Sequence, residues 1–226
     1  PDVVTFNTLI RGWCKRGDME MATKVFDLAS KMNVAPDEVS YNTVIRGWCE
    51  RGCEDRAIKV MKQMKEAGVR PNVVTLTTLI RSYCKNKNMS AAMSVLDVMR
   101  ESGLRPDVRT YTTLIQGWIE LKKMDRAMDL FKKMKRNKRM RPTVVTYTSL
   151  ISGWARSMGQ MDEAEKVMHD LMNDRNVFPD NRTFDALFRG FGYLFQEDRN
   201  WRAERMYYWL CRMRDMKFKP NQHTMK

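Results

Sequence analysis

The seven prolines of this chain are spaced almost evenly, and this period constrains the fold more than any other feature of the sequence. The intervals between them are 35, 35, 35, 36, 37 and 41 residues, and the prolines are Pro1, Pro36, Pro71, Pro106, Pro142, Pro179 and Pro220. Related phrases follow them, such as PNVVTLTTLI at residues 71–80 and PDVRTYTTLI at residues 106–115. A fixed period in this range predicts a solenoid, because each repeat can bury its apolar face only against its neighbours.

Each repeat has the pattern of two helices joined by a turn. A serine or threonine stands four residues after each of the first six prolines, where we expect a helix N-cap: Thr5, Ser40, Thr75, Thr110, Thr146 and Thr183. In the opening repeat, Phe6, Leu9, Ile10 and Trp13 recur at helical spacing and predict a buried stripe. Gly17 marks the turn, and the second helices are expected to begin near Met19, Glu54, Met89, Met124, Met161 and Asn200. The pattern predicts an all-α solenoid of about six stacked helix-turn-helix repeats.

The whole chain, residues 1–226, is predicted to be a single array. The repeats are expected at about 3–37, 38–72, 73–107, 108–143, 144–180 and 181–221, with 222–226 as the start of a further repeat. Because Pro1 and Asp2 match the last two residues of an earlier copy of the phrase, we expect the chain to come from a longer protein. The last complete repeat is lengthened, as repeats that cap an array often are.

Composition excludes several classes of function. Lys and Arg number 41 against 27 Asp and Glu, a formal net charge of +14, which attracts polyanions such as nucleic acid or an anionic membrane. The five cysteines lack the paired spacing of metal ligands, and Cys14, Cys49 and Cys84 share one column as small core residues. Two histidines are too few for a His-based metal site or a catalytic triad. We therefore predict no metal, no cofactor, no catalytic residue and no enzyme activity.

No stretch approaches the ~18–20 apolar residues that a membrane span needs, so no span is predicted.

Two further columns indicate close packing of helices. Aromatic residues near the end of the first helix, such as Trp13 and Trp48, are expected in the core rather than as base-stacking platforms. A glycine column should let neighbouring helices approach closely: Gly12, Gly47, Gly117, Gly153 and Gly190.

Residues 3–17 (VVTFNTLIRGWCKRG) and 68–75 (GVRPNVVT) closely resemble the pentatricopeptide repeat (PPR) family, and the spacing is similar to that of its P-type arrays. The resemblance implies a right-handed superhelix that binds single-stranded RNA in its groove, one base per repeat. In that family two residues read each base: one near the start of the first helix, here called the reading residue, and one at the close of the same repeat, here called the closing residue. The implied pairs are Asn7 with Asp37, Asn42 with Asn72, Thr77 with Asp107, Thr112 with Thr143, Thr148 with Asp180, and Asp185 with Asn221.

The family's code implies U for the first pair, C or U for the second, and G for the third and fifth. The fourth and sixth pairs are uncommon, so their bases stay open. The resemblance also implies that apolar residues sandwich each base: Val4, Val39, Val74 and Val145. Arg109 and Arg182 take this place in the fourth and sixth repeats, which weakens the expectation of base reading there.

Helical spacing predicts a basic stripe on the same surface. Arg11, Arg46, Arg81 and Arg189 lie four residues, about one helical turn, after the reading residues Asn7, Asn42, Thr77 and Asp185. Lys15, Lys85 and Arg156 lie about another helical turn further along their helices. Such a stripe suits contacts with RNA phosphates, and the alternative is a solvated polar face. A separate basic run at 132–141 is either an ordinary cationic helix end or a second surface for RNA outside the groove.

From the resemblance we expect an organellar single-stranded RNA-binding protein of a mitochondrion or plastid, acting in RNA processing, stability or translation. The alternative is a structural subunit of a large ribonucleoprotein such as an organellar ribosome, with relaxed base reading. Ribosomal or other ribonucleoprotein proteins would then be its partners alongside RNA.

Overall fold

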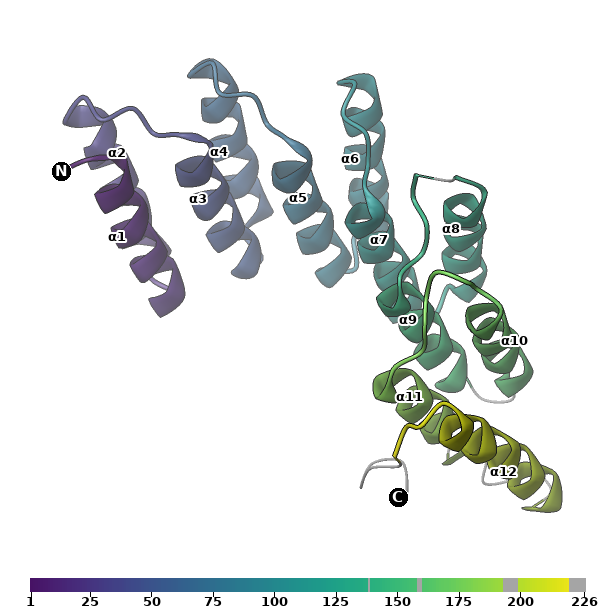
Figure 1. Ribbon diagram of the computed structural model, residues 1–226. Coiled ribbons are helices and arrows are strands. Elements are labelled where there is room, and N and C mark those ends of the chain that lie inside the picture. The colour runs from purple at the N-terminus through teal and green to yellow at the C-terminus, as the bar shows by residue number, and fades with distance from the viewer. Residues whose placement is uncertain (138, 158–159, 193–198, 220–226) are drawn as a thin grey trace. The chain divides into compact units, whose positions relative to one another are not determined.

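The computed structural model describes residues 1–137, 139–157, 160–192 and 199–219 (Figure 1). Within these residues the chain forms twelve helices and no strand, which confirms the all-α prediction. The helices are α1 (Val3–Arg16), α2 (Met19–Lys31), α3 (Glu38–Glu50), α4 (Glu54–Glu66), α5 (Val73–Lys85), α6 (Met89–Glu101), α7 (Val108–Glu120), α8 (Met124–Arg136), α9 (Val144–Ala155), α10 (Met161–Met172), α11 (Asn181–Gly192) and α12 (Arg199–Asp215).

The chain divides into two compact parts, an N-terminal part (Pro1–Leu114) and a C-terminal part (Ile115–Lys226). In the N-terminal part α1, α3 and α5 pack in a row, and α2, α4 and α6 each pack against the helix that precedes them (Figure 1). In the C-terminal part α9 packs against α10 and α11, and α11 contacts α12. Both parts are therefore built from stacked helix-turn-helix pairs, as the period predicts.

The core of each part lies where the two helices of a repeat cross. An alanine near the start of each second helix is fully buried in five repeats: Ala22, Ala57, Ala92, Ala127 and Ala164. The first residue of the stripe on each first helix is also buried: Phe6, Tyr41, Leu76, Tyr111, Tyr147 and Phe184. The candidate site lies beside this core, on the first turns of the first helices.

The turns between helices of a repeat use the left-handed backbone region at one repeated position. Gly17 and Gly52 occupy it with φ of 78° and 71°, and Lys87 and Lys122 occupy it in the next two repeats with φ of 60° and 57°. Glycine adopts this region without steric cost, whereas a side chain disfavours it. The predicted starts of the second helices are confirmed: five begin at the residue named, and α12 begins at Arg199, one residue earlier than expected.

The predicted N-caps are wrong by three residues. The caps are Asp2, Asp37 and Asn72, and the hydroxyl residue that follows each of them is the third helical residue, N3. The Asp37 carboxylate accepts hydrogen bonds from the backbone N–H of Ser40 at 2.8 Å and from its hydroxyl at 2.8 Å. Asp and Asn accept such bonds as well as Ser and Thr do, so the helix starts at the first of the two suitable residues.

The prediction that Leu9 is buried is also wrong, because its side chain is 48% exposed. The equivalent residues of later repeats, such as Val44 and Leu79, are buried. Among the described residues α1 packs only against α2 and α3, so Leu9 lacks the neighbouring helix that covers its equivalents. For the same reason Trp13 is only half-buried, while Trp48 and Trp154 are buried as predicted.

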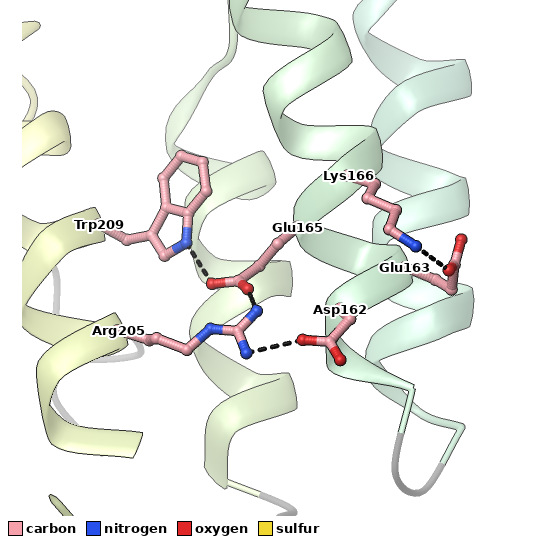
Figure 2. Close-up of polar contacts among 6 residues, drawn as sticks. All are labelled: Asp162, Glu163, Glu165, Lys166, Arg205 and Trp209. Atoms are coloured by element: carbon pink, nitrogen blue, oxygen red, sulfur yellow. Dashed lines mark hydrogen bonds and ion pairs between the residues drawn. The ribbon is translucent and has the colours of Figure 1, made fainter. Parts of the chain in front are cut away.

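The last repeat is held by a buried polar cluster that the sequence did not indicate. The Trp209 indole donates to Glu165 Oε1 at 2.6 Å, and Arg205 pairs with both Glu165 and Asp162 (Figure 2). Glu165 and Trp209 are both buried, so the carboxylate is paired and hydrogen-bonded as a buried charge requires. The cluster fixes α12 against α10, across 44 residues of sequence.

Candidate functional site

The first predicted pair, Asn7 and Asp37, comes together across the boundary between two repeats. The Asn7 side-chain amide donates from Nδ2 to Asp37 Oδ1 at 3.2 Å. Ser40 Oγ lies 2.6 Å from Asn7 Oδ1 and 2.8 Å from Asp37 Oδ1, so these two oxygens share one hydroxyl proton. Partial burial acts to raise the pKa of Asp37, but hydrogen bonds from Ser40 and Asn7 outweigh it and hold that pKa below its ordinary value. The carboxylate therefore stays ionised at neutral pH.

Two more reading residues of the N-terminal part, Asn42 and Thr77, meet an N3 hydroxyl of the following repeat. Thr75 Oγ1 donates to Asn42 Oδ1 at 2.7 Å, and Thr77 Oγ1 lies 2.8 Å from Thr110 Oγ1. The closing residue Asn72 also donates from Nδ2 to Glu38 Oε1 at 2.5 Å, a contact that the sequence analysis missed.

In the C-terminal part Thr148 Oγ1 lies 2.8 Å from Thr183 Oγ1, whose hydroxyl donates to the closing residue Asp180 at 2.7 Å. Thr143 caps α9, and Asp185 is buried on α11. Thr112 donates to the carbonyl of Val108 at 2.8 Å. The sixth closing residue, Asn221, lies outside the described residues.

The four predicted sandwich residues stand exposed beside the reading residues. Val4 is 70% exposed and Val74 is 56% exposed, and Val39 and Val145 are exposed as well. Each of these valines places exposed apolar surface beside polar groups, which suits contact with the face of a base. Arg109 and Arg182, which replace valine in the fourth and sixth repeats, are exposed too.

A groove of about 270 Å³ in the N-terminal part gathers residues of every predicted kind. The sandwich residue Val74, the reading residue Thr77 and the closing residue Asp107 line it. Its cations are Arg46, Arg81, Lys85 and Arg109, and Glu50 adds one acidic side chain. Within the described part of the chain, Arg46, Arg81 and Lys85 form no ion pair, so their charges are available to a ligand.

The remaining predicted phosphate contacts differ in their surroundings. Arg11 and Lys15 are exposed and, among residues that the structure describes, have no acidic partner. Arg156 pairs with Glu120 at 3.7 Å, and Arg189 donates from Nε to the carbonyl of Asp185 at 3.2 Å. The basic stripe is therefore freest in the N-terminal part.

The separate basic run lies on α8 and the segment after it. Lys132, Lys133, Lys135 and Arg136 are exposed, and Lys135 pairs with Asp170 at 2.8 Å. The apolar face of α8, including Phe131 and Met134, is buried, so the cations point to solvent. No groove residue of the N-terminal part belongs to this run.

Two further observations limit the chemistry of the described residues. No group of three or more His, Cys, Asp or Glu side chains there is arranged to hold a metal ion. No helix there is long and apolar enough to cross a membrane.

The family model of the PPR repeat family matches the chain five times in succession, at residues 1–50, 36–85, 71–118, 111–156 and 142–192. The chain belongs to the PPR repeat family. No curated protein matches this PPR chain significantly in sequence.

Solved structures of other PPR proteins have the same fold. The pentatricopeptide repeat protein PPR10 from maize superposes with a TM-score of 0.69 at 23% identity, covering 99% of this chain and 31% of PPR10. PPR10 in complex with an 18-nt psaJ RNA element gives 0.67 at 22% identity, with 99% and 35% covered. The PPR domain of Arabidopsis thaliana protein-only RNase P 1, in complex with tRNA, gives 0.54 at 21% identity, with 73% and 88% covered. The chain thus spans about a third of the PPR10 structures.

Proposed function

We propose that this PPR protein binds single-stranded RNA and reads one base with each repeat. The groove of the N-terminal part carries the proposal, because the reading pair Thr77 and Asp107, the exposed Val74 and the unpaired Arg46 and Arg81 line one cavity. An RNA strand needs these three elements together: polar groups for the base edge, apolar surface for its faces, and cations for the phosphates. PPR10 bound to an 18-nt RNA and an RNase P PPR domain bound to tRNA support the same use of the fold.

The pairs give the proposed core sequence U-(C/U)-G-N-G-N. Asn7 with Asp37 would read U, Asn42 with Asn72 would read C or U, and the two Thr and Asp pairs would read G. We further propose an organellar role, in a mitochondrion or plastid, in RNA processing, stability or translation, without catalysis by these repeats.

A structural role in a large ribonucleoprotein is the second candidate. It is favoured by the exposed cations of α8, none of which is a groove residue, and by Arg109 in the place of a sandwich valine. Under this candidate RNA binding would be strong at low salt but would not depend on base sequence.

Binding of two RNA oligonucleotides across a salt series separates these candidates. One carries the proposed core, and the other exchanges its G and pyrimidine positions. With about six phosphates engaged, log affinity should fall with log salt with a slope of roughly −4. We expect tighter binding of the first oligonucleotide, whereas equal, salt-sensitive binding of both would favour the structural candidate.

Charge variants locate the RNA on the protein. The double variant Arg46→Gln with Arg81→Gln should reduce the steepness of the salt slope by about 1.4, the share of two phosphate contacts. Lys132→Gln with Lys133→Gln removes the same charge from α8 and should leave the slope nearly unchanged. Equal effects of the two double variants would argue against the groove as the RNA site.

A further inference from the structure

A column of buried hydroxyl groups connects each reading residue to the closing residue of its pair. The column is Ser40, Thr75, Thr110 and Thr183, each at N3 of a first helix and at most 2% exposed. Each hydroxyl contacts a reading residue of the preceding repeat and the N-cap of its own helix. The N-cap is also the closing residue. The N3 hydroxyl therefore joins the reading residue to the closing residue, and it would not face the RNA itself.

The direction of the hydrogen bonds in this chain follows from counting protons. A hydroxyl has one proton to donate, and a carboxylate at neutral pH only accepts. Thr110 Oγ1 donates to Asp107 Oδ1 at 2.8 Å, so it can only accept from Thr77, 2.8 Å away. The Thr77 proton is therefore used within the protein, and its lone pairs face the groove. The same count applies in the fifth repeat. Thr183 Oγ1 donates to Asp180 Oδ1 at 2.7 Å, so it accepts from Thr148 Oγ1, 2.8 Å away.

Asparagine at the reading position has the opposite outcome. Thr75 Oγ1 lies 2.7 Å from Asn42 Oδ1 and 3.1 Å from Asn72 Oδ1, so its one proton goes to the nearer acceptor, Asn42. This hydrogen bond turns the oxygen of the Asn42 amide inward and leaves its amino group as the exposed donor. At Asn7 the Ser40 hydroxyl faces two acceptors, Asn7 Oδ1 at 2.6 Å and Asp37 Oδ1 at 2.8 Å, so the assignment for asparagine rests on Asn42.

We propose that the N3 hydroxyls are specificity-determining positioning residues, a deduction that rests on the proposed RNA-binding function. They make a threonine reading residue an acceptor, which suits the N–H groups on the edge of guanine. They make an asparagine reading residue a donor, which suits the carbonyl and ring-nitrogen acceptors of pyrimidines. The hydroxyl thus acts on the base through the reading residue and touches no RNA itself.

Thr110→Val and Thr75→Val test the proposal because each hydroxyl serves a different base. Valine keeps the shape of threonine. The backbone N–H of residue 110 still donates to the side chain of Asp107, at 2.8 Å, so the helix start is retained. In Thr110→Val we expect the preference for G at the third base to fall by about tenfold, from the loss of one ordered hydrogen bond. The pyrimidine preference at the second base should stay unchanged. Thr75→Val should show the reverse pattern.

Two controls separate positioning from stability. Thr110→Ser retains the hydroxyl and should restore the G preference. The Thr5 hydroxyl donates to the N-cap Asp2 at 2.7 Å in the first repeat, and no reading residue precedes it among the described residues, so Thr5→Val should change no base preference. A uniform loss of affinity with every preference kept, in both Thr110→Val and Thr75→Val, would overturn the proposal. Absence of any base preference in the unaltered protein would instead refute the proposed function, and this proposal with it.

Discussion

Asp37 illustrates how single residues of this protein serve two purposes. Its carboxylate caps α3 through Ser40 and also accepts from Asn7 of the preceding repeat. Hydrogen bonds that begin a helix therefore also orient the side chains that face the groove. Asn72 and Asp107 cap α5 and the first turn of α7. They are linked to the preceding reading residue through the hydroxyls of Thr75 and Thr110.

Burial of the cysteine column predicts a pattern of thiol reactivity. Burial raises the pKa of Cys49 and of Cys84 to about 12, so both thiols are protonated near pH 8 and shielded from reagents. We expect iodoacetamide to modify the partly exposed Cys53 and Cys211 first, with Cys49 and Cys84 modified only on unfolding. Mass spectrometry of peptides from the native and the urea-treated protein measures this, and rapid native labelling of Cys49 would contradict the burial.

The site columns could be predicted from the sequence, but their hydrogen bonds could not. Asn7 and Asp37 are 30 residues apart, and the resemblance to the PPR family implied that they belong together. The role of Ser40 was misassigned because Asp37 and Ser40 are both suitable N-caps, and only the backbone decides between them. The donation from Asn72 to Glu38 has no repeated signal in the sequence, so it could not have been found there.

At the scale of helices, packing depends on neighbours that the repeat pattern does not specify. Three glycines of the predicted column have atoms of the adjoining repeat within 3 Å of the position that a Cβ would take: Gly47, Gly153 and Gly190. Gly12 has nothing within 4 Å. Glycine is therefore required for close packing at some positions of this column and not at others, just as Leu9 is exposed while its equivalents are buried.

The effect of alanine substitution on the free energy of unfolding should change sign along this glycine column. In Gly190→Ala the new Cβ would lie 2.6 Å from Ala155 Cβ and 3.1 Å from its Cα, so backbone must move, at a cost of about 1–3 kcal/mol in the free energy of unfolding. In Gly12→Ala the open site should give a gain of up to about 1 kcal/mol from helix propensity. Urea unfolding measures both. A stabilised Gly190→Ala would refute the close approach of α11 to α9.

At the scale of the whole molecule, the net charge of +14 is distributed unevenly along the chain. Residues 122–141 alone carry ten Lys and Arg against two Asp. The groove of the N-terminal part has fewer cations, but among the described residues Arg46, Arg81 and Lys85 form no ion pair and stand beside reading and sandwich residues. Under the proposed function, charge density sets where polyanions are attracted, and the neighbourhood of Thr77 is where a base would be read.

The period was enough to predict the helical array, since it repeats over nearly the whole chain, and the motifs at residues 3–17 and 68–75 indicated the family. It could not predict the Glu165, Arg205 and Trp209 cluster, because the last repeat departs from the period and its contacts join residues about 40 apart. The fourth reading pair also stays without an assigned base, since Thr112 with Thr143 is an uncommon combination.

The most direct test of base reading is a change of code at one position. Thr77→Asn creates beside Asp107 the combination that Asn7 and Asp37 form in the first repeat. Binding of this variant to four RNAs that differ only at the third base should show a change of preference from G to U. The change should amount to at least about tenfold, with the other positions unaffected. Retained preference for G, or equal affinity for all four RNAs before and after the substitution, would contradict reading of one base by each repeat.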